Sequence, residues 1–309
     1  MHYCSYPDYL RNLLGERVQK LSINAGFTCP NRDGTSGVGG CSFCSGLAFS
    51  PAYCNNRTPI TQQIDDGMEF HKNRSHKNNP NTKYLAYFQT FSNTYQSVDN
   101  LKKIYSEALD HPGIIGIIIA TRPDCIDDEK LDYIQQLSES YFVKIEYGIE
   151  STYNSTLQKI NRGHDFETTV TAFEKTAKHN IHSGGHLIFG LPGETPDMMI
   201  DEAKAISSLP IESIKLHQLQ IMRGTGLADE YKSNPDIVHL FSLDDYIDTI
   251  TGFIERLRPD IAIERIASEV PQRFLAVPSQ WGFVKYETVL QKFEKHLADT
   301  GSFQGKLFN

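Results

Sequence analysis

Three closely placed cysteines constrain this 309-residue chain more than any other feature of its sequence. Cys29, Cys41 and Cys44 follow the pattern C-x11-C-x2-C, and four glycines lie at residues 34–40. Two cysteines three residues apart can direct both sulfurs to one centre, and glycine accepts the positive φ angles that let a third cysteine fold back onto it. The spacing therefore predicts a metal site.

The kind of metal site depends on how many ligands the chain supplies. Structural zinc takes four closed ligands, whereas an iron–sulfur cluster held by three thiolates leaves one iron free for a substrate or cofactor. No fourth cysteine lies nearby, which favours the open cluster. A zinc knuckle completed by a histidine, and buried thiols that bind no metal, are the alternatives. Cys4, Cys54 and Cys125 are isolated in the sequence, so we expect free thiols and one cluster only.

Charge and hydropathy argue against two classes of partner. Lys and Arg number 30 against 38 Asp and Glu, a formal net charge of -8, so no general basic surface for nucleic acid is expected and a polyanion would meet a local patch. The longest apolar run, residues 114–120, is too short to span a bilayer, and no signal peptide precedes it. We expect a cytoplasmic protein without a membrane partner, whose cysteines stay reduced.

Strands and helices are predicted to alternate along the chain. Apolar runs predict strands at residues 17–24, 83–91, 113–121, 142–150, 184–193 and 211–221, with a further candidate at 260–267. Asp127, Thr195 and Ser242 are predicted N-caps of intervening helices. The alternation predicts an α/β fold of the βα-barrel type, whose chemistry lies in the loops after the strands. The cysteine loop follows the first strand and belongs to that face.

We expect two parts in the chain. Residues 1–265 would form the core barrel with a short N-terminal extension, and residues 266–309 would form a C-terminal extension that packs on it. Trp281, the only tryptophan, is predicted to anchor this extension and not to stack on a base.

The cysteine segment resembles a known family in its details. CPNRDG at residues 29–34 and GGCSFC at residues 39–44, with Phe43 just before the last cysteine, resemble the radical S-adenosylmethionine (SAM) superfamily, and within it the YhcC/YtqA-like relatives of the Elongator catalytic subunit. The resemblance implies a partial (β/α)6 TIM-like barrel with short terminal extensions. It also implies a 4Fe-4S cluster on Cys29, Cys41 and Cys44 whose free iron chelates SAM for reductive cleavage.

The resemblance further implies a wall of cofactor-binding residues at successive strand ends. Phe43 and Ile188 would contact the adenine, Glu150 the ribose hydroxyls, and Arg162 the SAM carboxylate, while Gln89 and Asn93 would lie near the methionyl group. Each has a simpler interpretation: Glu150 in an ordinary ion pair, Arg162 at a helix end, Asn93 in a turn.

Two residues are candidates for a direct role in catalysis. Cys125 could donate a hydrogen, and His217 could face the pocket. A free thiol and a satisfied core histidine are the competing interpretations.

For the substrate, the resemblance points to tRNA. One branch of the family is linked to remodelling the (carboxymethyl)aminomethyl side chain of wobble uridine 34, and the electron donor would be a flavodoxin- or ferredoxin-type protein. Residues 72–83 and 285–295 contain the lysines that could meet anticodon-loop phosphates. A radical SAM enzyme acting on a small metabolite or peptide, and a zinc-stabilised barrel that only binds RNA or protein, are the alternatives.

Overall fold

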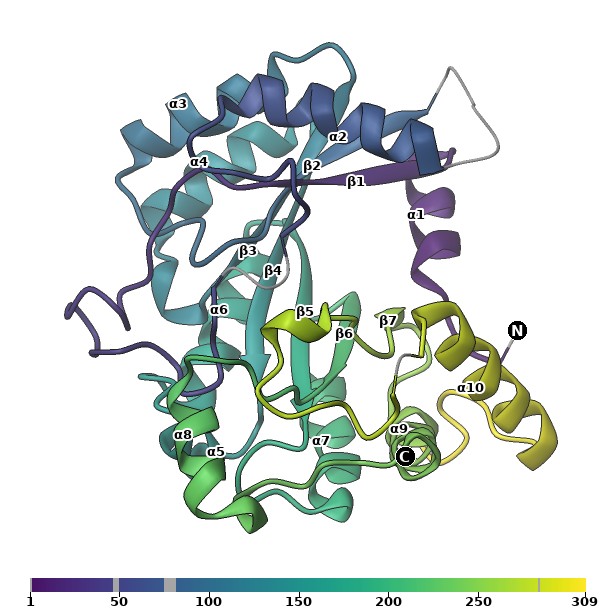
Figure 1. Cartoon of the computed structure of the whole chain (residues 1–309). Coiled ribbons are helices and arrows are strands. Elements are labelled where there is room, and N and C mark those ends of the chain that lie inside the picture. Colours follow the sequence, from purple (N-terminus) through teal and green to yellow (C-terminus); the bar gives the residue numbers. More distant parts are fainter. Residues whose placement is uncertain (1, 47–49, 75–81, 283) are drawn as a thin grey trace.

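A computed structural model describes every residue except 1, 47–49, 75–81 and 283. Its centre is a curled sheet of seven parallel strands in chain order (Figure 1). The strands are β1 (Val18–Ile23), β2 (Lys83–Phe88), β3 (Ile114–Thr121), β4 (Phe142–Glu150), β5 (His182–Phe189), β6 (Ser213–Gln218) and β7 (Ala262–Arg265). β1 and β7 stand at opposite ends of the strand order, so the barrel is open on one side. The predicted partial barrel is confirmed, with β7 as the further strand.

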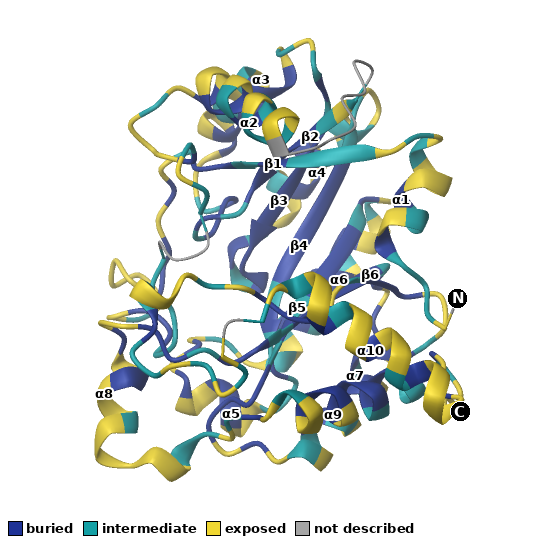
Figure 2. Cartoon of the chain, turned by 45° about the vertical axis from the view of Figure 1, so that its right-hand side comes forward, coloured by how far each residue is buried: buried dark blue, intermediate teal, exposed yellow. Residues whose placement is uncertain are grey.

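Helices cover the outer face of the sheet and bury its apolar side chains. They are α2 (Ile60–Arg74), α3 (Val98–Leu109), α4 (Asp128–Ser138), α6 (Phe166–Lys178), α7 (Pro196–Ser208) and α9 (Leu243–Arg256). Figure 2 shows the central strands buried along their length, while the helices expose their outward sides. β3 illustrates the cause: its side chains are buried on both faces, and a parallel strand covered in this way reads as an unbroken apolar run.

Helix caps follow the sequence closely. Asp127, Thr195 and Ser242 each accept a hydrogen bond from the backbone N–H three residues further on, as predicted. Two short helices, α5 (Asn154–Lys159) and α8 (Gly226–Ser233), were not expected, because so few turns display little periodicity.

The two terminal extensions pack on the barrel. α1 (Tyr6–Leu14) buries Tyr6 and Leu10 against Ala262 of β7. α10 (Tyr286–Thr300) adds three buried side chains to the main core: Val289, Phe293 and Leu297.

Trp281 anchors the C-terminal extension, as expected. Its Nε1 donates to the Phe241 carbonyl at 2.9 Å, and its ring lies 4.9 Å from that of Tyr246, between centroids. The division at residue 265 stays a prediction.

One of the two lysine-containing segments predicted to contact RNA phosphates, residues 72–83, lies mostly outside the described residues.

Within the described chain, none of the helices combines the length and apolarity that crossing a bilayer requires.

Candidate metal and cofactor site

The cysteine loop leaves the C-terminal end of β1 and folds back on itself. Cys29 and Cys41 are buried and Cys44 is half-buried, and all three are free thiols. Gly40 has a φ of 80° and donates its N–H to the Asn31 carbonyl at 2.7 Å, which closes the loop. The Cys44 N–H donates to the Cys41 carbonyl at 3.0 Å, so the C-x2-C segment forms a turn.

The groups around the Cys41 sulfur fit a thiolate. Arg162 Nη1, Asn31 Nδ2 and Arg122 Nη1 lie 3.5, 3.7 and 4.0 Å from it. Two cationic donors and one amide directed at a single sulfur favour the anionic form, which is the form that ligates metals. Among the described residues, no three His, Cys, Asp or Glu side chains are close enough to hold a metal ion. The fit to an iron–sulfur cluster therefore rests on the chemistry of these donors.

Arg162 connects the cysteine loop to the end of β4. Besides Cys41, it donates to the Gly148 carbonyl and lies 3.4 Å from a Glu150 carboxylate oxygen. Burial lowers the pKa of Arg162, but the neighbouring Cys41 and Glu150 outweigh burial and raise it overall. Two residues expected to bind SAM thus lie together beside an expected cluster ligand. The ion pair that the simpler interpretation of Glu150 predicted is also present, and its partner is Arg162.

Glu150 has an unusual backbone. Its φ is 68°, in the left-handed region, and the pairing of β4 with β5 shifts register between Gly148 and Glu150. Such a bulge redirects a side chain at a strand end, and strained backbone of this kind is frequent at binding sites.

Sequence reasoning missed the part played by Arg122. Its guanidinium makes two hydrogen bonds to Asp124, at 2.8 and 2.6 Å, while Nη1 faces Cys41. The TRPD segment at residues 121–124 was the available signal, since an arginine after a buried strand lies at the barrel's functional edge.

The remaining candidates lie around this edge. Phe43 and Ile188 pack against one small apolar cluster that includes Leu157 and Leu191. Asn93 donates to carbonyls at the ends of β2 and β3, at 3.1 and 2.8 Å, and its Oδ1 is buried without a partner in the described part of the chain. Gln89 directly follows β2 and is half-buried.

Cys125 and His217 have different surroundings. Cys125 is buried, and burial together with Asp124 raises its pKa to about 12, so it is a neutral thiol at pH 7. His217 is half-buried on β6 and pairs in register with Ile188 of β5.

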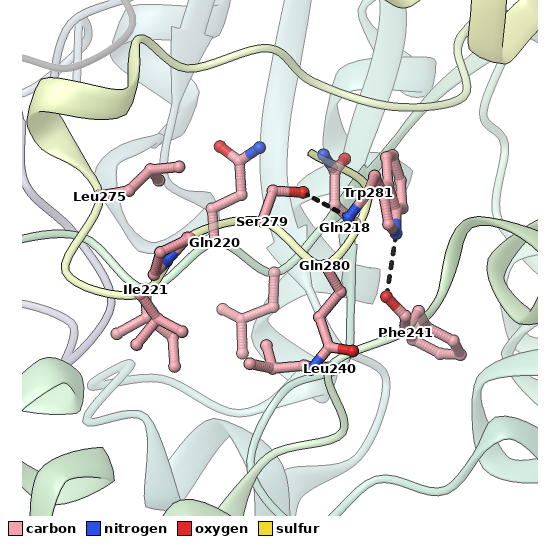
Figure 3. A pocket seen from close by; sticks show the side chains of 12 residues that line it. Gln218, Gln220, Ile221, Leu240, Phe241, Leu275, Ser279, Gln280 and Trp281 are labelled. Atoms are coloured by element: carbon pink, nitrogen blue, oxygen red, sulfur yellow. Dashed lines mark hydrogen bonds between the residues drawn. The ribbon is translucent and has the colours of Figure 1, made fainter. Parts of the chain in front are cut away.

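A pocket beyond the end of β6 is too small for a cofactor. Gln218, Gln220 and Ile221 line it from β6 and the loop after it, and Ser279 and Trp281 from the C-terminal extension (Figure 3). Its volume is about 30 Å³, which holds one or two waters.

The chain was compared with known protein families. Residues 26–206 match the radical SAM superfamily, and residues 211–298 match the radical SAM C-terminal domain. The first match covers more than half of the chain. The chain belongs to the radical SAM superfamily. It is therefore an enzyme that uses a 4Fe-4S cluster and SAM.

Individual relatives place it more narrowly. Protein YtqA of Bacillus subtilis is 38% identical over 302 residues, which are 97% of this chain and 91% of YtqA. Protein YhcC of Escherichia coli K12 is 31% identical over 284 residues, 90% of this chain and 89% of YhcC. The resemblance to the YhcC/YtqA-like family is confirmed.

More distant similarity extends to longer proteins. A tRNA uridine(34) acetyltransferase of Methanocaldococcus infernus is 26% identical over 140 residues, 44% of this chain and 25% of that protein. The solved structure of Elp3 from the same organism, with an N-terminal deletion, superimposes with a TM-score of 0.70 at 16% identity, over 93% of this chain and 64% of that one. This chain spans less than two thirds of that Elp3 chain, and the likeness shows the fold alone.

Proposed function

We propose that Cys29, Cys41 and Cys44 ligate the cluster, and that Arg162 and Glu150 bind SAM beside it. The observation that carries this assignment is the contact of Arg162 with both Cys41 and Glu150. When bound, the cluster and SAM supply a deoxyadenosyl radical. The chain's residues hold and orient SAM: Arg162 would pair with its carboxylate, Glu150 with its ribose, and Phe43 and Ile188 would cover its adenine. Gln89 and Asn93 would approach its methionyl group.

We further propose that the substrate is tRNA, and that the enzyme remodels the (carboxymethyl)aminomethyl side chain of wobble uridine 34. The similarity to a tRNA uridine(34) acetyltransferase supports this choice. An anticodon loop presents unpaired bases that can enter a site open on one side. A flavodoxin- or ferredoxin-type protein would supply the electron.

The cofactor assignment is tested by anaerobic reconstitution. We expect one oxygen-sensitive cluster per chain, visible by absorbance, and formation of deoxyadenosine from SAM after reduction. Replacing the three cysteines with alanine should abolish both, whereas Cys54→Ala serves as a control outside the C-x11-C-x2-C motif. Retained cleavage in the triple variant, or stoichiometric zinc in protein purified without oxygen, would contradict the assignment.

The substrate is tested by mass spectrometry of tRNA nucleosides from cells with and without the gene. We expect carboxymethylaminomethyl uridine to accumulate in the deletion strain and to disappear when the gene is restored. Unchanged tRNA nucleosides would direct the search to a small metabolite or peptide.

A further inference from the structure

Arg122 and Asp124 form an ion pair beside Cys41, one of the expected cluster ligands. β3 ends at Thr121, and Asp124 lies in the 3₁₀ turn Pro123–Cys125 that follows it. Nε and Nη2 of Arg122 donate to the two carboxylate oxygens of Asp124, at 2.8 and 2.6 Å, which occupies one edge of the guanidinium. The remaining nitrogen, Nη1, lies 4.0 Å from the Cys41 sulfur. The carboxylate therefore fixes the direction in which Arg122 presents Nη1.

The ion pair is largely shielded from solvent. The side chain of Arg122 is 4% exposed and that of Asp124 is 17% exposed. Burial lowers the pKa of Arg122, but the hydrogen bond to Asp124 outweighs burial and raises it overall, so the guanidinium is charged. Cys29 contributes to the same rise. The positive charge thus acts on two expected cluster ligands, through a medium that screens it far less than water does.

A charge at this place affects how readily a bound cluster is reduced. Reduction adds one electron, and so one negative charge, without moving a proton or making a bond. A neighbouring cation stabilises that added charge and raises the reduction potential, whereas a neighbouring anion lowers it. Hydrogen bonds to the ligating sulfurs also raise it. Arg122 supplies the cation and the N–H, and Asp124 supplies the opposing charge.

The contacts of Arg122 differ from those of Arg162, which also faces the Cys41 sulfur. Arg162 continues to Glu150 and the Gly148 carbonyl, where we place SAM. Within the part of the chain that the structure describes, the hydrogen bonds of Arg122 reach only Asp124 and Cys41. Its position therefore suits an effect on the cluster more than a contact with SAM.

We propose that Arg122 and Asp124 set the reduction potential of the iron–sulfur cluster: Arg122 raises it through Cys41, and Asp124 orients Arg122 and limits the rise. This inference rests on the proposed function, because it requires a cluster on the three cysteines of the C-x11-C-x2-C motif. The electron comes from the proposed flavodoxin- or ferredoxin-type donor and passes on to SAM. The ion pair balances easy reduction by the donor against the reducing power that SAM cleavage needs.

The experiment is a redox titration of the reconstituted protein with dithionite, without SAM, followed by the EPR signal of the reduced cluster. Arg122→Gln removes the cation and should lower the potential by about 59 mV, which is a tenfold change for a one-electron couple and about the effect of one hydrogen bond to a charged group. Asp124→Asn removes the anion but keeps an oxygen that accepts from Arg122, so the potential should rise. The double variant should lie between Arg122→Gln and wild type.

The opposite signs separate this role from a structural one. If the two residues only held the loop in place, both single variants would loosen the same contacts and shift the potential in one direction or not at all. Arg122→Lys keeps the charge and should stay nearer to wild type than Arg122→Gln does. Iron content and thermal unfolding show which variants are intact. If Arg122→Gln does not fold, the direction of the shift in Asp124→Asn decides.

Arg258 and Asp260 provide a matched control pair. They have the same spacing in the sequence, and Arg258 Nε donates to Asp260 at 2.6 Å. They precede β7, at the end of the parallel sheet opposite the cysteine loop, which follows β1. Arg258→Gln and Asp260→Asn should leave the reduction potential unchanged.

The outcomes distinguish this inference from the function on which it rests. A wild-type protein that forms no cluster would contradict both. Intact clusters whose potentials are equal in all variants, or shift in one direction in Arg122→Gln and Asp124→Asn, would overturn the inference and leave the cysteine assignment standing. We expect Arg122→Gln to keep its affinity for SAM. A loss of SAM affinity with an unchanged potential would identify Arg122 as a SAM ligand and overturn its proposed role.

Discussion

At the scale of single residues, the guanidinium of Arg162 is the most connected group of the candidate site. It reaches Cys41, the Gly148 carbonyl and Glu150 from one planar group. An ammonium group is a point donor and cannot span partners in these three directions. The contacts of Arg162 therefore depend on the planar shape of its guanidinium as well as on its charge.

Arg162→Lys should weaken SAM binding and leave the cluster in place. The expected loss is roughly tenfold to hundredfold, corresponding to about 1.5–3 kcal/mol for a hydrogen bond to a charged group. Titration of reconstituted variants with SAM measures it, alongside iron content. Glu150→Gln should lose affinity in the same range.

Arg258→Lys is the control for Arg162→Lys. Arg258 also donates to several carbonyls, those of Ser207, Leu209 and Ile211, but at the opposite side of the fold from the cysteine loop. It should lower stability without changing SAM affinity. Normal SAM affinity in both Arg162→Lys and Glu150→Gln would show that the cofactor wall lies elsewhere.

At the scale of elements, the bulge at the end of β4 holds this ion pair in place. A Cβ built on Gly148 would lie 2.8 Å from Arg162 Nη2 and would also contact the Glu150 carboxylate. The strand end thus requires a residue without a side chain, for steric reasons and not for its φ angle.

Gly148→Ala should therefore displace the ion pair and reduce SAM affinity by about tenfold, the cost of one weakened charged contact. Gly226→Ala is the matched control, because its Cβ would meet Ser42 of the cysteine loop only at ordinary distances of 3.9–4.0 Å. SAM titration and thermal unfolding of both variants distinguish a local effect from misfolding. Wild-type affinity in Gly148→Ala would mean that the pair is not part of the SAM site.

The turn after β5 and helix α7 bring two buried carboxyl groups together. Ser151 donates to Glu194, and the Thr152 N–H donates to Glu202 at 2.6 Å. Burial raises the pKa of Glu194 to about 7, and burial together with Glu194 raises that of Glu202. Both acids hold their protons more tightly in the folded chain than in the unfolded one.

The contribution of this pair of acids to stability should consequently fall as the pH rises. The buried histidines His164, His186 and His217, whose pKa values are lowered, act in the opposite direction, so the pair is measured as a difference between variants. The contribution of Glu194 is fully present below its unfolded pKa near 4.5 and is lost as the pH rises to about 7, a change of about 3 kcal/mol in the free energy of unfolding. Glu202→Gln should flatten this dependence, because its amide can donate to Glu194. Urea unfolding between pH 5 and 8 measures the slope, with exposed Glu174→Gln as control. A slope unchanged in Glu202→Gln would exclude the pair as its source.

Elements were predictable where one local pattern determines them. The run at residues 114–120 could only be a covered strand, and Asp127, Thr195 and Ser242 capped helices as their side chains suggested. The ion pairs inside the half-barrel could not be predicted, because lysines on β1, β4 and β6 meet glutamates on β4 and β7 only once the sheet has formed. They join Lys20, Lys144 and Lys215 to Glu146 and Glu264. Such pairing depends on strand order and inward direction, which no short stretch of sequence encodes. The role of Arg122 was not predicted either, although the TRPD segment places this arginine directly after a buried strand.

At the scale of the whole molecule, the C-terminal extension belongs to the core. Val289, Phe293 and Leu297 join the main apolar cluster, and Gln304 donates to the carbonyls of Arg258 and Ile261. These contacts tie the chain's end to α9 and the segment leading into β7.

A fragment of residues 1–265 should therefore fail to fold. Fully burying such side chains contributes about 1.5–3 kcal/mol each, so losing three removes a large part of the 5–15 kcal/mol typical of a domain. Circular dichroism and proteolysis of the fragment test this. Trp281→Phe, which loses the hydrogen bond to Phe241 and part of the ring packing on Tyr246, should cost about 2 kcal/mol and leave the protein folded. A soluble, cooperatively unfolding fragment would show that the boundary at residue 265 separates an independent domain.

β1 and β7 end the strand order, so each has one edge that pairs with no other named strand of the sheet. An exposed strand edge offers unpaired backbone groups and invites aggregation. Here the segment before α1 pairs with β7 through Ser5 and Ile263, and the Ile263 N–H donates to the Cys4 carbonyl at 2.8 Å. On β1, Lys20 points inward, as charged residues on guarded edges do. The first residues of the chain thus cover part of the β7 edge, and we expect their removal to increase the aggregation of the protein.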